Sequence, residues 1–269
     1  MKTSLPSLMY KTFLPNKAYI QNLLLTMSAW QRAFLSPRRP DQSQYGLTVH
    51  VRGAVTQPCC VDGSPKSISL DLVAHKIRFG MQHWRLEELS GQQLFDWLSL
   101  WSAKHGVQLP KPGFTKAPGH YSEEQTNSYA TVLWWSHAVL KKISNKLTEG
   151  ACSSLLLYPH HFDTAFSWYP FHDSRQLTVG FSPGDEHLEE AYFYLTAYPE
   201  LSSLPGLVVP PAAVWQQTGF HGYALYYDRL RHLTEPDKNV TISMLELLKA
   251  ASSLMRVDVD GQSHPQSHG

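Results

Sequence analysis

The sequence predicts an α+β protein in which antiparallel sheets pack against helices. Short strands follow one another in each half without helices between them, which favours antiparallel pairing. The order helix, strands, helix occurs twice along the 269 residues, which predicts two pseudo-repeated halves of one compact unit. The composition is 42% hydrophobic and 17% charged, as in an ordinary globular protein. A chain of this length buries enough surface to fold without disulfides or metal.

The first predicted helix follows an N-cap at Asn16, whose side-chain oxygen can accept from the free amides of the first turn. Apolar residues then recur at steps of three and four, a helical stripe, at Ile20, Leu23, Met27, Trp30 and Phe34. Pro37 and Pro40 end the helix. Residues 1–16 are therefore expected to form an N-terminal extension, and 17–106 the first half.

Alternation of apolar and polar residues predicts the strands of the first half. They are expected at residues 47–51, 68–72, 76–79 and 82–86. Gly80 lies between the last two strands, which predicts a tight hairpin. Ser90 and Gln93 form a capping box that opens a helix, and Gly106 ends it.

Residues 107–121 contain several prolines and glycines and are predicted to link the halves. Ser122 and Gln125 match a second capping box, at the start of a long helix that reaches Gly150. Strands are expected at 155–158, 165–169, 177–181 and 192–197. Thr241 is the expected N-cap of the last helix. The second half is 122–257, and the polar residues 258–269 are expected to form a disordered tail.

Charge and cysteine usage restrict the partners and the compartment. Lys and Arg total 23 and Asp and Glu total 22, so no basic surface for nucleic acid is expected. No window has the roughly 18 apolar residues of a membrane span, and the N-terminus lacks the pattern of a signal peptide. Cys59, Cys60 and Cys152 are too few and too irregularly spaced for a disulfide framework. We therefore expect a cytoplasmic protein with no membrane partner.

The densest group of chemically active residues is Tyr-Pro-His-His-Phe-Asp at 158–163. In an extended chain His161 and Asp163 share one face and His160 lies on the other. A histidine oriented by a carboxylate can act as a general base or a metal ligand, so His160, His161 and Asp163 are the candidate catalytic residues. The alternative is a buried polar network that fixes a strand crossing. In either case at least one of the two histidines should be buried.

The second group of candidates is acidic and follows Ser-Pro-Gly, a sequence that is typical of a turn. Asp185 and Glu186 would lie at a strand end as ligand-binding candidates, or else belong to a solvated acidic loop. Antiparallel pairing should bring Asp185 close to His161 and Asp163. Two well-placed ligands are too few for a tight metal site, so a divalent metal would bind weakly if at all. No cofactor is predicted.

Two further ligand-binding candidates lie outside these groups. Arg52 ends a strand of the first half, near Asp71 and His75, and is otherwise an ordinary paired surface residue. Trp215 precedes the glycine-flanked aromatic loop 219–222, where it could stack on a ligand or act as an aromatic plug.

Three motif blocks together resemble the domain of unknown function 5996 family. They are residues 158–163, 180–186 and 190–194. Weaker similarities lie at Arg52-Gly53, at Asp71 with His75, and at Trp215 with Gly219-Phe220, so the resemblance would span roughly residues 17–248. It implies a mostly bacterial protein without an established activity.

The sequence lacks the common signatures for nucleotide, serine hydrolase and zinc protease sites. We therefore expect a small-molecule-binding protein or enzyme, with a His/Asp site where the two halves meet. The alternative is a non-catalytic interaction module that uses exposed aromatic loops.

Overall fold

The computed structural model describes residues 4–35, 43–171, 173–200, 206 and 208–262. The chain is α+β, as predicted, and divides into two compact units. Unit 1 comprises residues 1–137 and 155–164, and unit 2 comprises 138–154 and 165–269. This division differs from the predicted linker at 107–121, because the first part of the following helix belongs to unit 1.

Unit 1 contains a five-stranded antiparallel sheet and a separate two-stranded ribbon. The sheet order is β1 (Thr48–His50), β2 (Gly53–Val55), β5 (Ile68–Asp71), β6 (Lys76–Phe79) and β7 (Gln82–Arg85). The ribbon pairs β3 (Cys59–Val61) with β4 (Ser64–Lys66). The predicted hairpin between β6 and β7 is confirmed, and Gly80 turns it at a φ of +59°, a conformation that glycine adopts without steric cost.

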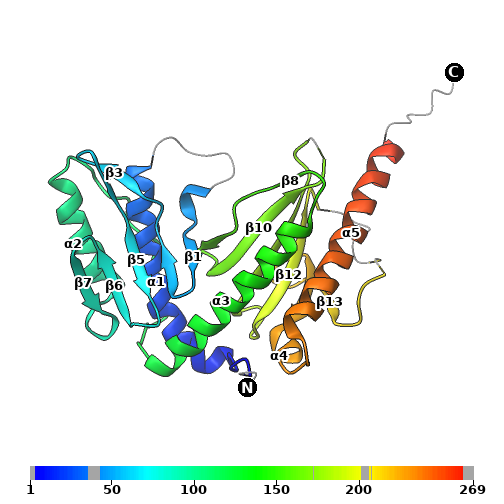
Figure 1. Cartoon of the computed structure of the whole chain (residues 1–269), viewed down its shortest axis with the longest axis horizontal. Helices are drawn as coiled ribbons and strands as arrows, with labels where there is room; N and C mark the ends of the chain where they lie inside the picture. The colour runs from blue at the N-terminus through cyan, green and yellow to red at the C-terminus, as the bar shows by residue number, and fades with distance from the viewer. Residues whose placement is uncertain (1–3, 36–42, 172, 201–205, 207, 263–269) are drawn as a thin grey trace. The chain divides into compact units, whose positions relative to one another are not determined.

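Two helices lie side by side against the sheet of unit 1 (Figure 1), α1 (Tyr10–Phe34) and α2 (Gly91–Ala103). Both contact the buried ring of Phe79 on β6, α1 through Trp30 and α2 through Trp97 and Trp101. Short 3-10 turns η1 (Ser43–Tyr45) and η2 (Leu86–Glu88) join the elements. The aromatic contacts therefore fix both helices on the same strand.

The predicted start of the first helix is wrong. The helix begins at Tyr10 and contains Pro15, so Asn16 lies within it and is not an N-cap. The Asn16 carboxamide oxygen instead accepts from the Ser122 amide at 2.9 Å, which ties α1 to the start of α3 (Glu123–Lys146). The long-range partner could not be read from local spacing. Pro37 and Pro40 lie outside the described residues, and the helix ends before them at Phe34.

The two capping boxes have different outcomes. Ser90 and Gln93 make both reciprocal bonds at the start of α2, which confirms that prediction. At α3 the Ser122 hydroxyl accepts from the Gln125 amide at 3.3 Å, which is one half of the box.

Unit 2 is built on an antiparallel sheet in the order β13, β14, β12, β11, β10, β8. The strands are β8 (Ala151–Cys152), β10 (Asp163–Tyr169), β11 (Gln176–Ser182), β12 (Tyr192–Tyr198), β13 (Ala213–Gln216) and β14 (Gly222–Tyr226). Asp163 and Thr164 of β10 belong to unit 1, as does β9 (Leu156–Tyr158). Helices α4 (Tyr227–Leu230) and α5 (Pro236–Gln262) follow, and α5 packs on β11 and β12.

Helix α5 differs from its prediction at both ends. It begins at Pro236, so Thr241 is not its N-cap, and the Thr241 hydroxyl donates to the Asp237 carbonyl at 2.7 Å within the helix. It ends at Gln262, past the predicted start of a disordered tail at 258. The rest of that tail, 263–269, lies outside the described residues.

Gly180 of β11 lies directly opposite Tyr194 of β12. A Cβ atom on Gly180 would come within 2.4 Å of the Tyr194 ring, closer than any packed contact allows. The Tyr194 ring therefore covers Gly180. These two motif residues fit together because the glycine has no Cβ atom.

We predict that Gly180→Ala destabilises the protein by about 1–3 kcal/mol, the usual effect of overpacking a filled site. Denaturant unfolding measures the loss. Gly113→Ala is the matched control, because its Cβ would have no atom within 4 Å. In a Tyr194→Ala background Gly180→Ala should be nearly neutral, and an equal loss in both backgrounds would contradict the packing explanation.

Candidate functional site

Unit 1 holds a cavity of about 340 Å³ with an aromatic lining. Its side chains come from the β3–β4 ribbon, the β6–β7 hairpin and α2 with the turn after it. The central ones are Phe79, Trp97, Trp101, Asp62, Lys66 and His105. The volume lies at the small end of ligand pockets, about 300–1,000 Å³, so the cavity suits a small molecule.

The aromatic rings of the cavity hold one another in place. Phe79 meets Trp97 at 5.6 Å and Trp101 at 4.7 Å between ring centroids, both edge to face. Trp84 supports Trp97 in the same geometry at 4.8 Å. Edge-to-face pairs stabilise beyond their buried area. Phe79 is buried while Trp97 and Trp101 stay half-exposed, so apolar ring surface faces the cavity.

Charged groups complete the lining. Asp62 Oδ2 lies 2.8 Å from His105 Nδ1, and the centre of the His105 ring lies 4.2 Å from that of Trp101. Lys66 is half-buried and forms no ion pair within the described part of the chain. The positive charge at this cavity that remains uncompensated is therefore the Lys66 ammonium group.

Sequence reasoning missed this cavity. It assigned the residues around Gly80 to a hairpin and those between Ser90 and Gly106 to a helix, without a site at either. The available signal was the pair Trp97 and Trp101, four residues apart on one helix face, followed by His105 on the same side. The ribbon that supplies Asp62 and Lys66 was not predicted at all.

The predicted catalytic histidines do not have the predicted geometry. Residues 158–162 form a tight turn, closed by a hydrogen bond from the Phe162 amide to the Tyr158 carbonyl at 2.8 Å. Phe162 has a φ of +56°, so the chain is not extended there, and the expected alternation fails. His160 and His161 are both exposed, which corrects the expectation that at least one is buried.

The two residues after the histidines enter the core of unit 1. Phe162 stacks on Tyr129 at 5.1 Å between ring centroids. Asp163 is buried beside it, and burial together with the Asp163 charge raises the pKa of the Tyr129 phenol. Asp163 therefore faces the interior, and the two histidines face solvent.

The predicted ligand-binding residues are divided between the units. Arg52 lies in unit 1 with His160, His161 and Asp163, whereas Asp185, Glu186 and Trp215 lie in unit 2. A grouping of His161, Asp163 and Asp185 therefore stays a prediction, as do the roles assigned to these residues.

Arg52 and Asp71 form an ion pair. The Arg52 Nε donates to Asp71 Oδ2 at 2.8 Å, and Asp71 Oδ1 accepts from the Ala74 amide at 2.8 Å. Burial by itself would raise the pKa of Asp71, but these hydrogen bonds and the charges of Arg52 and Arg78 lower it below the ordinary 3.8. This pair fixes the turn between β5 and β6.

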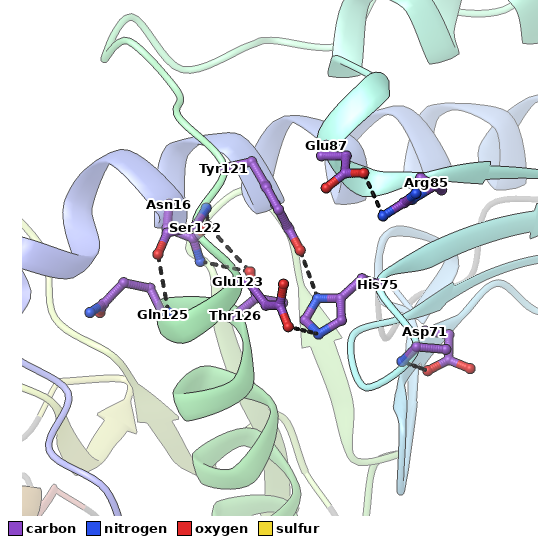
Figure 2. Close-up of polar contacts among 11 residues, drawn as sticks. Asn16, Asp71, His75, Arg85, Glu87, Tyr121, Ser122, Glu123, Gln125 and Thr126 are labelled. Atoms are coloured by element: carbon purple, nitrogen blue, oxygen red, sulfur yellow. Dashed lines mark hydrogen bonds and ion pairs between the residues drawn. The ribbon is translucent and has the colours of Figure 1, made fainter.

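His75 lies at the end of the same turn, at a φ of +52°. The Tyr121 hydroxyl is 2.8 Å from His75 Nδ1, and Glu123 is 4.0 Å from Nε2 on the other side of the ring (Figure 2). Burial, Glu123 and Glu87 raise the pKa of Tyr121, so the phenol keeps its proton and can donate to His75. The network joins residues before α3 to the sheet.

Asp185 accepts hydrogen bonds within its own loop. Its Oδ1 accepts from the amides of His187 at 2.8 Å and Leu188 at 2.9 Å, and its Oδ2 accepts from the Tyr192 hydroxyl at 2.9 Å. Glu186 is exposed and lies 3.7 Å from the His187 ring. Among the two alternatives for this acidic group, these contacts favour a loop stabilised by its own carboxylate.

Trp215 is on β13, and its ring meets Tyr223 edge to face at 5.1 Å. The loop after it is anchored by Phe220, which stacks on Tyr192 at 5.6 Å with 9° between the planes. Tyr192 also belongs to an apolar cluster with Ala224 and Tyr226. These contacts favour the aromatic plug over a stacking surface.

Metal-binding clusters and membrane-spanning helices are both absent from the described residues. These residues contain no group of three or more His, Cys, Asp and Glu side chains placed to hold a metal ion. Within the same residues no helix combines the length and the apolar character needed to cross a membrane.

Comparison with known proteins supports the resemblance drawn from the motifs. Residues 171–263 match a family of unknown function, DUF5996, so the resemblance to this family is confirmed over that segment. The matched segment contains the blocks at 180–186 and 190–194 but not the block at 158–163. No curated protein and no solved structure matches the chain.

We predict that Asp185→Ala lowers the free energy of unfolding by about 1–3 kcal/mol, because two amides and a phenol lose their shared acceptor. A double-mutant cycle with Tyr192→Phe, followed by urea unfolding, should show coupling between the two side chains. Glu186→Gln is the control and should change stability by less than about 0.5 kcal/mol. Unchanged stability in Asp185→Ala would indicate that the carboxylate is kept for a ligand.

The Arg52–Asp71 pair predicts a pH effect on stability. A carboxyl whose folded-state pKa is depressed stabilises the fold above its unfolded pKa, and this contribution is lost as pH falls through the folded value. Wild-type protein should therefore lose stability below about pH 4 more steeply than Asp71→Asn. Thermal unfolding between pH 5 and pH 3 measures the difference, and parallel curves would contradict it.

Proposed function

We propose that this protein binds a small planar acid in the aromatic cavity of unit 1. The observation that carries the proposal is the combination of half-exposed Trp97 and Trp101 rings with the uncompensated Lys66 ammonium group in one cavity. Tryptophan faces stack on flat ligands, and the lysine favours a negative group on them. The Asp62 carboxylate faces His105 at 2.8 Å, and the proposal places the acid group of the ligand at Lys66.

The mouth of the cavity favours a small ligand over a protein partner. Met81, beside Gly80 in the β6–β7 turn, is fully exposed and belongs to the lining. A methionine side chain is flexible and adapts to irregular apolar surfaces, so Met81 can close over a bound ring. The alternative, an interaction module with aromatic loops, has less support, because Phe220 and Trp215 pack within their own unit.

The proposal also includes the cellular compartment of the protein and the kind of organism that it comes from. Cys59, Cys60 and Cys152 are free thiols, which is the usual state in a reducing cytoplasm. A bacterial source is proposed because the resemblance drawn from the sequence motifs implies one. Both statements are part of the proposal and can be tested apart from ligand binding.

The test uses three probes with one ring and different charges, namely benzoate, benzyl alcohol and benzylamine. We expect benzoate to shift the indole N–H signals of Trp97 and Trp101 in ¹H–¹⁵N NMR at millimolar concentration, with weaker binding for the neutral probe and the weakest for the cation. Trp101→Leu should abolish the effect on Trp97, and Lys66→Gln should remove the preference for benzoate.

Trp215→Leu is the matched control, since it removes another half-exposed indole from unit 2. It should leave benzoate binding unchanged. Circular dichroism establishes that each variant is folded. The proposal is wrong if benzoate shifts the signal of Trp215 and not those of the pair on α2. It is also wrong if Lys66→Gln binds each of the three probes as strongly as the wild-type protein does.

A further inference from the structure

The last turn of α1 carries an arginine without an acidic partner. The guanidinium carbon of Arg32 lies 5.0 Å from the centre of the Tyr45 ring. Its Nε is buried and has no hydrogen-bond partner, and within the residues that the structure describes Arg32 forms no ion pair. A buried donor without an acceptor is unfavourable, so this group has capacity for a ligand.

The His160–His161 turn lies beside this arginine. The His160 ring meets Tyr45 edge to face at 6.4 Å between centroids, so Tyr45 contacts both Arg32 and His160. Neither histidine has a carboxylate partner among the described residues. Arg32 and His160 therefore both contact one tyrosine, and His161 is the next residue of the same turn.

The arrangement is held by backbone contacts and does not depend on the charged groups themselves. The Gln21 carboxamide donates to the carbonyls of Pro159 at 2.8 Å and His160 at 3.1 Å. The Ser28 hydroxyl donates to the Tyr45 carbonyl at 2.9 Å. Both donors are on α1, as is Arg32, so one helix positions the turn, the tyrosine and the guanidinium.

Electrostatics agree with an uncompensated positive site. Burial, then the charge of Arg32, then that of His161 lower the pKa of His160. The ionisable groups that face the His160 ring are Arg32 from α1, Tyr45 from η1 and His161 from its own turn. None of these three groups is a carboxylate.

We propose that Arg32, His160 and His161 form an oxyanion-binding site for the phosphate or carboxylate group of a small molecule. A guanidinium binds either group through two parallel hydrogen bonds, and the half-buried Arg32 has no ion-pair partner among the described residues. This assigns the histidine pair to anion recognition rather than to a catalytic pair with Asp163. The site is independent of the aromatic cavity and does not rest on the function proposed for it.

A bound anion favours the protonated form of His160, so affinity should rise as pH falls. The relevant range lies at and below the ordinary histidine pKa of 6.5, because the free site holds His160 below that value. Phosphate carries less charge at lower pH, whereas acetate keeps its charge to about pH 5. Acetate is therefore the cleaner probe of this dependence.

The experiment titrates inorganic phosphate, acetate and chloride into the full chain at constant ionic strength and follows the histidine ring signals by NMR. His160→Asn identifies the His160 signal. We expect phosphate or acetate to shift the His160 and His161 signals at millimolar concentration, and chloride to have no comparable effect. A preference for phosphate or for acetate tells which oxyanion group the natural ligand carries.

Arg32→Gln should weaken oxyanion binding at least tenfold, and Arg32→Lys should weaken it less. Arg229→Gln is the matched control, because Arg229 also lies over a tyrosine ring, at 4.7 Å from Tyr226, but belongs to unit 2. His160→Asn changes an exposed residue and tests the site even if Arg32→Gln does not fold. Equal effects of Arg32→Gln and Arg229→Gln, or equal binding of chloride, would overturn the proposal.

Discussion

The burial of Phe79 is the contact on which unit 1 depends. Its ring meets Trp30 of α1 and both Trp97 and Trp101 of α2, so one side chain of β6 determines where two helices lie. The same contacts leave part of each α2 indole uncovered, and this uncovered surface is what lines the cavity. The packing that stabilises the unit thus also forms the aromatic wall of the cavity.

The family-matched segment has a different character. In unit 2 the motif residues satisfy one another, since Gly180 accommodates the Tyr194 ring and Asp185 accepts from the Tyr192 hydroxyl. A carboxylate that accepts three hydrogen bonds in its own loop has little capacity left for a ligand. Packing and loop geometry therefore account for these motif residues of unit 2.

Both sites proposed for unit 1 select negative ligands for the same physical reason. Lys66 and Arg32 are basic groups for which the described chain supplies no carboxylate, although the acidic and basic residues of the whole sequence nearly balance. Some acids are already paired with other basic groups, as Asp71 is with Arg52 and Asp237 with Lys142. A net charge near zero is therefore compatible with local positive sites, because the ion pairs between acidic and basic side chains leave some basic groups without a partner.

By itself the sequence determined the α+β class, the β6–β7 hairpin around Gly80 and the cap at Ser90, because these depend on neighbours a few residues apart. It also indicated the resemblance to the family through the blocks at 180–186 and 190–194. Only the tertiary structure decided that Asn16 bonds to Ser122 and that Asp163 is buried while His160 and His161 are exposed. A prediction from spacing along the chain assumes that the backbone keeps one conformation. Phe162 has a positive φ, and this single residue changes which side chains face the core. The cavity likewise depends on contacts between β6, α2 and a ribbon far apart in the sequence, and local patterns carry no information about such contacts.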